Sequence, residues 1–448
     1  MQQLAKEYTG EDASAYEAAG QAFRLPYWDW ASDSQVPPSC TRQNITVNGP
    51  DGRLTVRNPL YSYRWHEHPL DQNLFPNSNN WQDETTRSPN DNSTFPVDEV
   101  NAKLSQQAQI ITLRVVSDEF ESMTALHQYR AFSSSNTYEK MASMTGMGAS
   151  FEAPHNDIHN LVGGSFATLT VTSFDALFSD MSGPSMFHHC NLDRLAAMWS
   201  AIHYENTVQT VPYQSNGLFA TAKGEDITAD SPLKPFYRAD GRSFHTTRSV
   251  LNTSDLGYTY PEFQKLDSDA YRASRQMIEI VNDLYGSLLP PGVKRPHRKR
   301  ATNRQAAKET TKDWVVSLEV ERSELALPCT INIYMRDRYA GRTTLLNMPK
   351  QGLVSDEIPL AQAIDATYFR GMASGEIEDQ LEAGLRFEIK KDDGTTVDPK
   401  TVPSLKLDVQ GFDVTPPNST YEFPSYDKGR QSYSKVFAQY NGTKPAVP

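Results

Sequence analysis

The chain has 448 residues, of which 38% are apolar and 22% are charged, and its formal net charge is −12 at pH 7. This length is sufficient for two or three domains that each bury a core. The acidic balance argues against nucleic acid as the main partner, and no apolar run approaches the ~18 residues of a membrane span. We therefore expect a globular protein that binds neither nucleic acid nor a membrane.

The cysteines and the N-terminal segment bear on the cellular compartment. The three cysteines, Cys40, Cys190 and Cys329, are too few for a disulfide framework and favour a reducing compartment. The first residues, MQQLAKEYTGEDAS, contain no basic segment followed by an apolar one, so we expect no signal peptide. The compartment stays unassigned from the sequence, but the cysteine count and the N-terminal segment favour an intracellular one.

The first segment of the chain predicts a helical region that leads into a buried extended stretch. Residues 1–24 have a helical pattern with a break at Thr9-Gly10. The stripe that we expect this region to bury comprises Leu4, Tyr8, Tyr16, Ala19 and Phe23. Residues 25–31, LPYWDWA, predict an extended core segment, in which Asp29 needs a hydrogen-bond partner such as the backbone.

The following segments predict loops and then patches of helix. Residues 33–100 are rich in Pro, Asn, Asp and Ser, which predicts long loops. His66 and His68 lie there in an H-x-H arrangement that can bind metal on a strand, but we interpret them as exposed loop residues. Residues 101–145 predict short helices, and we interpret His127 as a packed helix residue rather than a ligand.

A histidine-rich stretch over residues 155–203 holds five of the ten histidines. His155 and His159 are spaced i, i+4, which places both imidazoles on one face of a helix. His188 and His189 open a second predicted helix. Two histidines from one helix and one from another can close a three-nitrogen metal site, and imidazole suits copper, zinc, iron and nickel.

The last third of the chain predicts a linker and then a β domain. Residues 286–312 combine prolines and glycines with eight Lys or Arg, and we interpret them as a solvated linker rather than a nucleic-acid patch or nuclear signal. A helix is predicted just before it, over residues 270–289. Apolar and polar residues then alternate over four segments, which predicts an antiparallel β-sandwich: 314–321, 329–336, 385–391 and 404–414.

Two motifs in the histidine-rich stretch resemble a known family. HN-x-x-H-N-x-V-G-G, from residue 155, and F-H-H-C-N-x-D-R-L, from residue 187, resemble the copper-B half of the type 3 copper proteins: tyrosinases, catechol oxidases and molluscan haemocyanins. LPYWDWA supports the resemblance, and the Cys-Asn after the histidine pair is similar to fungal tyrosinases. The resemblance implies a mainly α, helical-bundle catalytic domain with long loops over residues 1–285, the linker 286–312, and an all-β, sandwich-like C-terminal domain over 313–448. In this family the C-terminal domain covers the copper site.

The resemblance also implies a chemistry and a set of residues. Type 3 sites hold two copper ions, each bound by three histidines, and use O2 to o-hydroxylate monophenols and to oxidise o-diphenols to o-quinones. The copper-B ligands implied here are His155, His159 and His189, with His188 a neighbour. Glu152 and Asn156 match the family residues that hold a water for deprotonating the phenol, which implies monophenolase as well as diphenolase activity. The implied partners are a phenolic small molecule and O2; the sequence makes no prediction of oligomeric state.

Asp193 lies four residues after His189 and has two open interpretations. It can orient a ligand imidazole, or it can form a structural ion pair with Arg194. A local departure from the family lies just upstream, where Gly183-Pro184 replaces an Asp-Pro. We therefore expect the turn before the tandem histidines to differ from the family's.

A larger departure concerns the second copper ion. In this family the copper-A histidines precede LPYWDW, but only 24 residues precede Leu25 here and none is His. We therefore expect an N-terminally incomplete copper domain that contains the copper-B half. The alternatives are a truncated chain and a copper-B-only paralogue that binds one copper and is impaired or inactive. A zinc hydrolase is a third class, since three histidines also suit zinc, but no other motif indicates hydrolysis.

Overall fold

The computed structural model describes residues 2–73, 118–163, 187–286 and 311–440, apart from gaps of one to three residues inside these ranges. The chain divides into two compact units. The first comprises Met1–Val116 and Leu161–Asp193, and the second comprises Ser117–Asn160 and Arg194–Pro448. No helix in the described ranges combines the length and the apolar character that a membrane span requires.

Two short helices open the first unit, α1 (Gln2–Ala5) and α2 (Ala13–Ala22). The predicted break is present, and Gly10 adopts a left-handed backbone with φ of +90°. The predicted buried stripe is wrong, because Leu4 is 44% exposed and Phe23 is 42% exposed. The break reorients the chain between the two helices, so one apolar face does not continue from the first to the second.

A β-hairpin follows, which corrects the prediction of loops only over residues 33–100. Its strands are β1 (Asn44–Gly49) and β2 (Gly52–Arg57), and they pair antiparallel in register. A single turn of 3-10 helix, Pro38–Cys40, precedes it. His66 lies beyond the hairpin and is exposed, whereas His68 and residues 74–117 lie outside the described residues.

The LPYWDWA segment is buried as predicted only in its second half, since Leu25 at its start is 39% exposed. Trp28 is 4% exposed and Trp30 is 1% exposed. The Trp28 backbone N–H donates to the carbonyl oxygen of Phe187 at 3.0 Å, so this segment fixes the residue that opens the second histidine-bearing helix. Asp29 accepts a hydrogen bond from the hydroxyl of Ser32 at 2.9 Å, which supplies a partner for this carboxylate.

The helical part of the second unit consists mainly of five helices, two of which begin or end in the first unit. They are α4 (Asp118–Ser134), α5 (Tyr138–Ala142), α6 (Glu152–Gly163), α8 (Phe187–Ile202) and α9 (Ala270–Tyr285). The predicted helices of the histidine-rich stretch are thereby confirmed, and the helix predicted over residues 270–289 is present and ends at Tyr285. α9 buries positions 274, 277, 281 and 285, the 3.6-residue spacing of an amphipathic helix.

Over residues 204–265, the described part of the chain forms only short elements. They are β3 (Tyr213–Gln214), β4 (Asp226–Ile227) and the 3-10 turns Thr247–Val250, Thr253–Leu256 and Pro261–Phe263. A further 3-10 turn, Met144–Gly146, joins α5 to α6. The linker predicted over residues 286–312 lies almost wholly outside the described residues.

The C-terminal part of the second unit is a β-sandwich, which confirms the predicted fold class. Its strands are β5 (Thr311–Glu321), β6 (Cys329–Met335), β7 (Arg338–Leu345), β8 (Leu353–Pro359), β9 (Leu385–Lys391), β10 (Thr396–Val397), β11 (Lys406–Thr415) and β12 (Ser425–Ser432). They form two antiparallel sheets with orders β10-β9-β6-β7 and β12-β11-β5-β8. The four predicted segments correspond to β5, β6, β9 and β11; the other strands and α10 (Ser374–Gly384) were not predicted.

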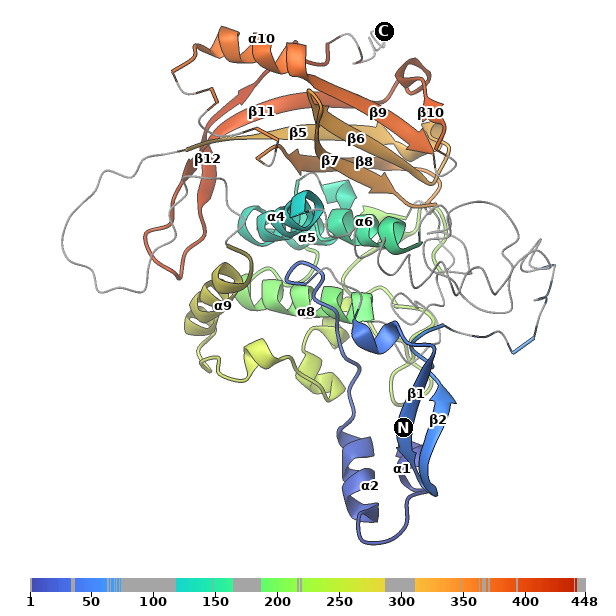
Figure 1. Ribbon diagram of the computed structural model, residues 1–448. Helices are drawn as coiled ribbons and strands as arrows, with labels where there is room; N and C mark the ends of the chain where they lie inside the picture. Colours follow the sequence, from blue (N-terminus) through green and yellow to red (C-terminus); the bar gives the residue numbers. More distant parts are fainter. Residues whose placement is uncertain are drawn as a thin grey trace. The chain divides into compact units, whose positions relative to one another are not determined.

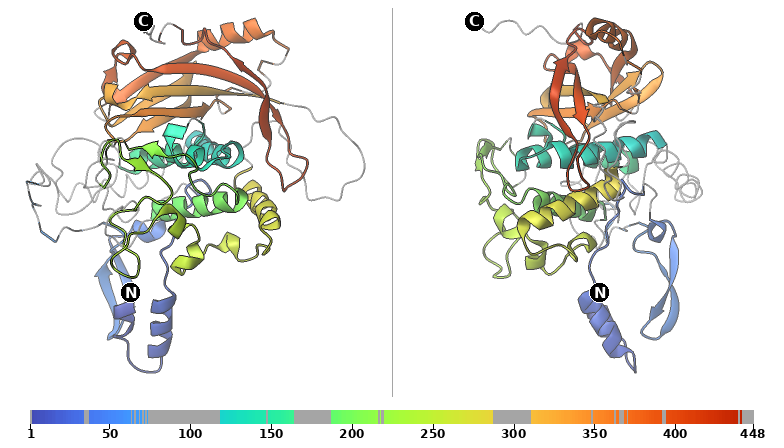
Figure 2. Two further views of the ribbon diagram at one scale, coloured as in Figure 1. Left: turned by 180° about the vertical axis from the view of Figure 1, so that it is seen from behind. Right: turned by 90° about the vertical axis from the view of Figure 1, so that its left-hand side faces the viewer.

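The sandwich core is apolar, and alternate residues of each strand build it. Val316 and Leu318 of one sheet and Ile331, Ile333 and Ile389 of the other are all fully buried in one cluster. Within the second unit, α4, α5 and α6 run along the side of this sandwich (Figures 1 and 2). The histidine-bearing helix α6 therefore borders the C-terminal β region.

Candidate metal centre

Helix α6 presents its two histidines on one face, as the i, i+4 spacing predicts. The His155 and His159 ring centroids are 4.4 Å apart. Their Nε2 atoms lie 3.0 Å from each other, within hydrogen-bond distance, so the two imidazoles face the same point. His159 is 8% exposed, and its neighbours Asn156 and Asp157 are also buried.

Asn156 determines which nitrogen of His155 is available to a metal. The Asn156 amide Nδ2 donates to the backbone carbonyl of Thr344 in β7 at 3.2 Å. A carbonyl can only accept, so this contact orients the amide and leaves Oδ1 as the atom 2.9 Å from His155 Nδ1. His155 Nδ1 must then carry the proton, and the unprotonated Nε2 faces His159.

Asp157 links the same stretch of α6 to the β-sandwich through hydrogen bonds. Its Oδ1 accepts from Arg342 Nε at 3.1 Å and from the Thr344 hydroxyl at 2.6 Å. Asp157 is 1% exposed, and burial raises the pKa of its carboxyl, a shift that the Arg342 guanidinium opposes. Strand β7 thus contacts both residues that follow His155, and no local sequence signal identified this contact.

Helix α8 presents the second histidine pair in its first turn. His188 is fully buried, and its ring lies 6.1 Å from Trp30 and 5.0 Å from the ring of His189. Burial lowers the pKa of His189 to about 4, so this imidazole is neutral at neutral pH. A neutral imidazole is the form that binds a metal.

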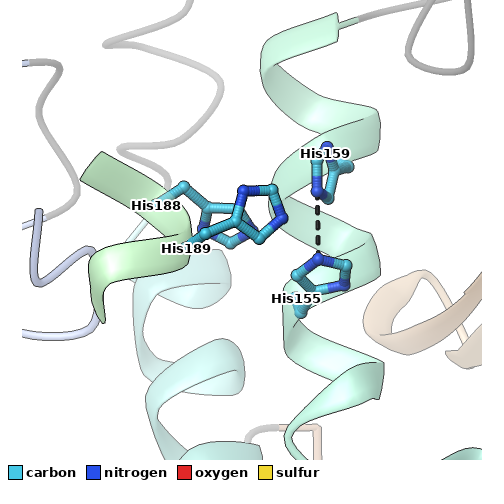
Figure 3. Close-up of side chains that lie close together, drawn as sticks. All are labelled: His155, His159, His188 and His189. Carbon is cyan, nitrogen blue, oxygen red and sulfur yellow. Dashed lines mark hydrogen bonds between the residues drawn. The ribbon is translucent and has the colours of Figure 1, made fainter. Parts of the chain in front are cut away.

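The four histidines form one group, shown in Figure 3. One ligand nitrogen from each of His155, His159, His188 and His189 lies within 4.8 Å of the others. Among the described residues, this is the only cluster of three or more His, Cys, Asp or Glu side chains that can hold a metal ion. His188 belongs to the group as well as His189, so the choice of His189 as the third ligand stays a prediction.

The donor set fits a copper or zinc ion. Metal–imidazole distances are about 2.0 Å, so two nitrogens 3.0 Å apart can share one ion. All the donors are imidazoles, which copper and zinc both accept. Neither the donors nor their spacing distinguishes the two metals.

The predicted water-holding residues are already engaged in structural contacts. Glu152 Oε2 accepts from the Ser143 hydroxyl at 2.9 Å and from the Met144 backbone N–H at 2.8 Å, which joins the turn before α6 to its first residue. Asn156 donates its amide Nδ2 to the Thr344 carbonyl oxygen, and its Oδ1 lies beside His155 Nδ1. Their catalytic roles stay predictions.

Arg194 and His127 have structural partners. Arg194 Nη2 lies 2.6 Å from Glu262 Oε1, and Nη1 donates to the Tyr285 hydroxyl at 3.0 Å, while Asp193 is exposed. His127 is buried in α4 with its Nε2 2.7 Å from the Glu357 carbonyl oxygen, which confirms its interpretation as a packed residue.

The sequence matches two family models. The first is the common central domain of tyrosinase, over residues 2–202, and the second is the tyrosinase C-terminal domain, over residues 313–409. Together they cover more than half of the chain.

Curated relatives include fungal phenol-oxidising enzymes. A tyrosinase of Podospora anserina is 30% identical over 310 residues, which are 64% of this chain and 50% of the relative. Polyphenol oxidase 2 of Agaricus bisporus is 28% identical over 299 residues, 64% of this chain and 49% of the relative. The chain spans about half the length of these relatives.

Solved structures share the fold. Recombinant mushroom tyrosinase abPPO4 superposes with a TM-score of 0.75 at 21% identity, over 97% of this chain and 80% of that one. The holo-protyrosinase of Aspergillus oryzae superposes with a TM-score of 0.62 at 18% identity, over 96% of this chain and 78% of that one.

Proposed function

The chain belongs to the tyrosinase family of copper oxidases, and we propose that it binds copper through the histidines of α6 and α8. The observation that carries the proposal is the convergence of His155 Nε2 and His159 Nε2 at 3.0 Å within a group of four imidazoles. The proposed ligands are His155, His159 and His189, with His188 beside them.

We propose further that the activity is oxidation of phenols. Monophenols would be o-hydroxylated, and o-diphenols would be oxidised to o-quinones while O2 is reduced to water. Bound copper would supply the electron transfer between phenol and O2. Burial keeps the His189 imidazole neutral, Asn156 orients the His155 imidazole, and Asp157 holds the same stretch of α6.

Glu152 is proposed to take the phenol proton together with Asn156. Its Oε2 is occupied by Ser143 and Met144, so this role falls to Oε1. The test compares rates with a monophenol and with an o-diphenol for Glu152→Gln. We expect monophenol hydroxylation to fall at least tenfold more than diphenol oxidation; equal changes for both substrates would remove Glu152 from the role of base.

The second candidate is a chain that binds one copper without oxidising phenols. The observation behind it is that the described residues contain a single histidine group, whereas the family reaction uses two copper ions. Copper content and electron paramagnetic resonance separate the candidates. One copper per chain, with an ordinary Cu(II) signal and no oxidation of an o-diphenol, supports the second; two coppers with turnover support the first.

A further inference from the structure

A cleft of about 340 Å³ lies in the second unit, between the end of α4 and strand β12. One wall comprises residues 133–136 and Lys140 of α5, and the other comprises Phe412 of β11 and Arg430 of β12. Its volume falls in the range of small-molecule sites, roughly 300–1,000 Å³. None of the four clustered histidines lines it.

The cleft is cationic, although the whole chain carries a net charge of −12. The described lining residues include three cations, Arg130, Lys140 and Arg430, and one carboxylate, Glu357. A local surplus of positive charge in an acidic protein attracts anions to that position.

The two arginines are held rigidly around one carboxylate and one aromatic ring. Arg130 is 2% exposed, and its Nη2 lies 3.4 Å from Glu357 Oε2, while Arg430 Nη2 lies 2.5 Å from Glu357 Oε1. Their guanidinium carbons lie 5.1 Å and 5.8 Å from the centre of the Phe412 ring. Asp313 also pairs with Arg130 at 3.4 Å, so the two carboxylates compensate the two arginines, and the excess charge belongs to Lys140.

Lys140 supplies the charge that no carboxylate neutralises. It is exposed, and no ion pair within 4.0 Å joins its ammonium to a carboxylate among the described residues. Asn136, also exposed at the rim, offers an amide that can donate a hydrogen bond. An ammonium and a guanidinium on opposite walls are the groups that bind phosphate and carboxylate oxygens.

We propose that this cleft binds a small oxyanion, carried by a phosphate- or carboxylate-bearing molecule, between Lys140 and Arg430. Arg130 and Glu357 hold Arg430 and the aromatic wall in place beneath it. Because Lys140 belongs to the helical part and Arg430 to the sandwich, a bound oxyanion bridges the two parts of the second unit. Binding should therefore raise the thermal stability of the whole unit.

The test is calorimetric titration of the full chain with inorganic phosphate and, separately, with succinate, at constant ionic strength maintained with sodium chloride. We expect saturable binding of at least one of the two, and a rise in Tm with the same ligand. Lys140→Met should weaken that binding at least tenfold. Lys435→Met is the matched control, because Lys435 is 70% exposed, pairs with Glu378 and does not line the cleft.

The outcomes distinguish the ligand classes and can overturn the proposal. Binding of phosphate alone assigns the cleft to phosphorylated molecules, and binding of succinate alone assigns it to carboxylates. Absence of saturable heat with both probes overturns the proposal, as does binding that Lys140→Met and Arg430→Gln leave at the wild-type level. Circular dichroism of each variant verifies that the fold is retained.

Discussion

The two helices that carry the histidine pairs are anchored by different physical means. Helix α6 is fixed by buried polar contacts with strand β7, through Asp157 and Asn156. The part of α8 in the second unit buries Leu195, Met198 and Trp199 fully, and its buried Arg194 pairs with Glu262 of the helical part rather than with the sandwich. The comparison teaches that the C-terminal sandwich determines how His155 is oriented, whereas α8 depends on the packing of the helical part.

The largest expected effect comes from breaking the α6 anchor. Arg342→Ala leaves the Asp157 carboxylate buried without its cation, which costs about 3–5 kcal/mol of unfolding free energy. Urea unfolding measures the loss. Lys435→Ala, which breaks an exposed ion pair, should change the unfolding free energy by less than about 1 kcal/mol. A loss below about 1 kcal/mol for Arg342→Ala would show that β7 does not anchor α6.

The matching substitution in α8 removes apolar packing. Leu195→Ala should cost about 2–5 kcal/mol, because the side chain is fully buried and its removal leaves a cavity. The same unfolding experiment measures it, and nuclear magnetic resonance should show His155 in its original tautomer. A change of His155 tautomer in Leu195→Ala would mean that the two helices are not anchored independently.

Asn156 tests the link from β7 to a ligand nitrogen. Asn156→Leu removes the acceptor of the His155 Nδ1 proton, so copper affinity should fall roughly 10–100-fold. The ¹⁵N shifts of His155 in the metal-free protein should change from the Nδ1-protonated pattern to a mixture.

Asn156→Asp serves as the rescue variant, because a carboxylate still accepts the proton. It should restore the Nδ1-protonated pattern. If Asn156→Leu leaves the ¹⁵N pattern of His155 unaltered, Asn156 does not select the tautomer.

The smallest expected effect is a pH dependence of the contact between α4 and β8. Burial raises the pKa of Asp356 from 3.8 to about 7 in the folded protein. The folded state then binds more protons than the unfolded state between these values, so Asp356 makes stability fall as pH rises through this window, by up to about 1.4 kcal/mol per pH unit. His127, 3.9 Å away, acts in the opposite direction because burial lowers its pKa.

Comparison with Asp356→Asn isolates the contribution of Asp356. Unfolding free energies of both proteins, measured from pH 4 to 8, should show the variant gaining stability relative to the wild type as pH rises. Parallel curves would contradict the raised pKa.

Local patterns in the sequence predicted the elements of the site but not what holds them. The i, i+4 spacing of His155 and His159 and the tandem His188 and His189 predicted two helices correctly, because a helix brings near residues together. The partners of Asp157 lie 185 and 187 positions away, and no local pattern encodes such a contact.

Two errors have different physical causes. Strand β7, RYAGRTTL, was not predicted because Gly341 and two arginines interrupt its apolar alternation. Its Arg342 and Thr344 side chains form hydrogen bonds with Asp157 of α6 rather than adding apolar surface to the sandwich core. The hairpin β1–β2 had a readable signal, alternation on both sides of Gly-Pro-Asp-Gly, which the polar composition of residues 33–100 outweighed.

Copper titration of the metal-free protein tests the central claim most directly. The comparison sets the wild type against a variant with His155→Ala and His159→Ala, with His66→Ala as the control because His66 is an exposed loop histidine. We predict tight copper binding with nitrogen hyperfine structure in the wild type and in His66→Ala, and loss of that binding in the double variant. Equal copper binding by all three proteins would contradict the assignment of the α6 histidines as ligands.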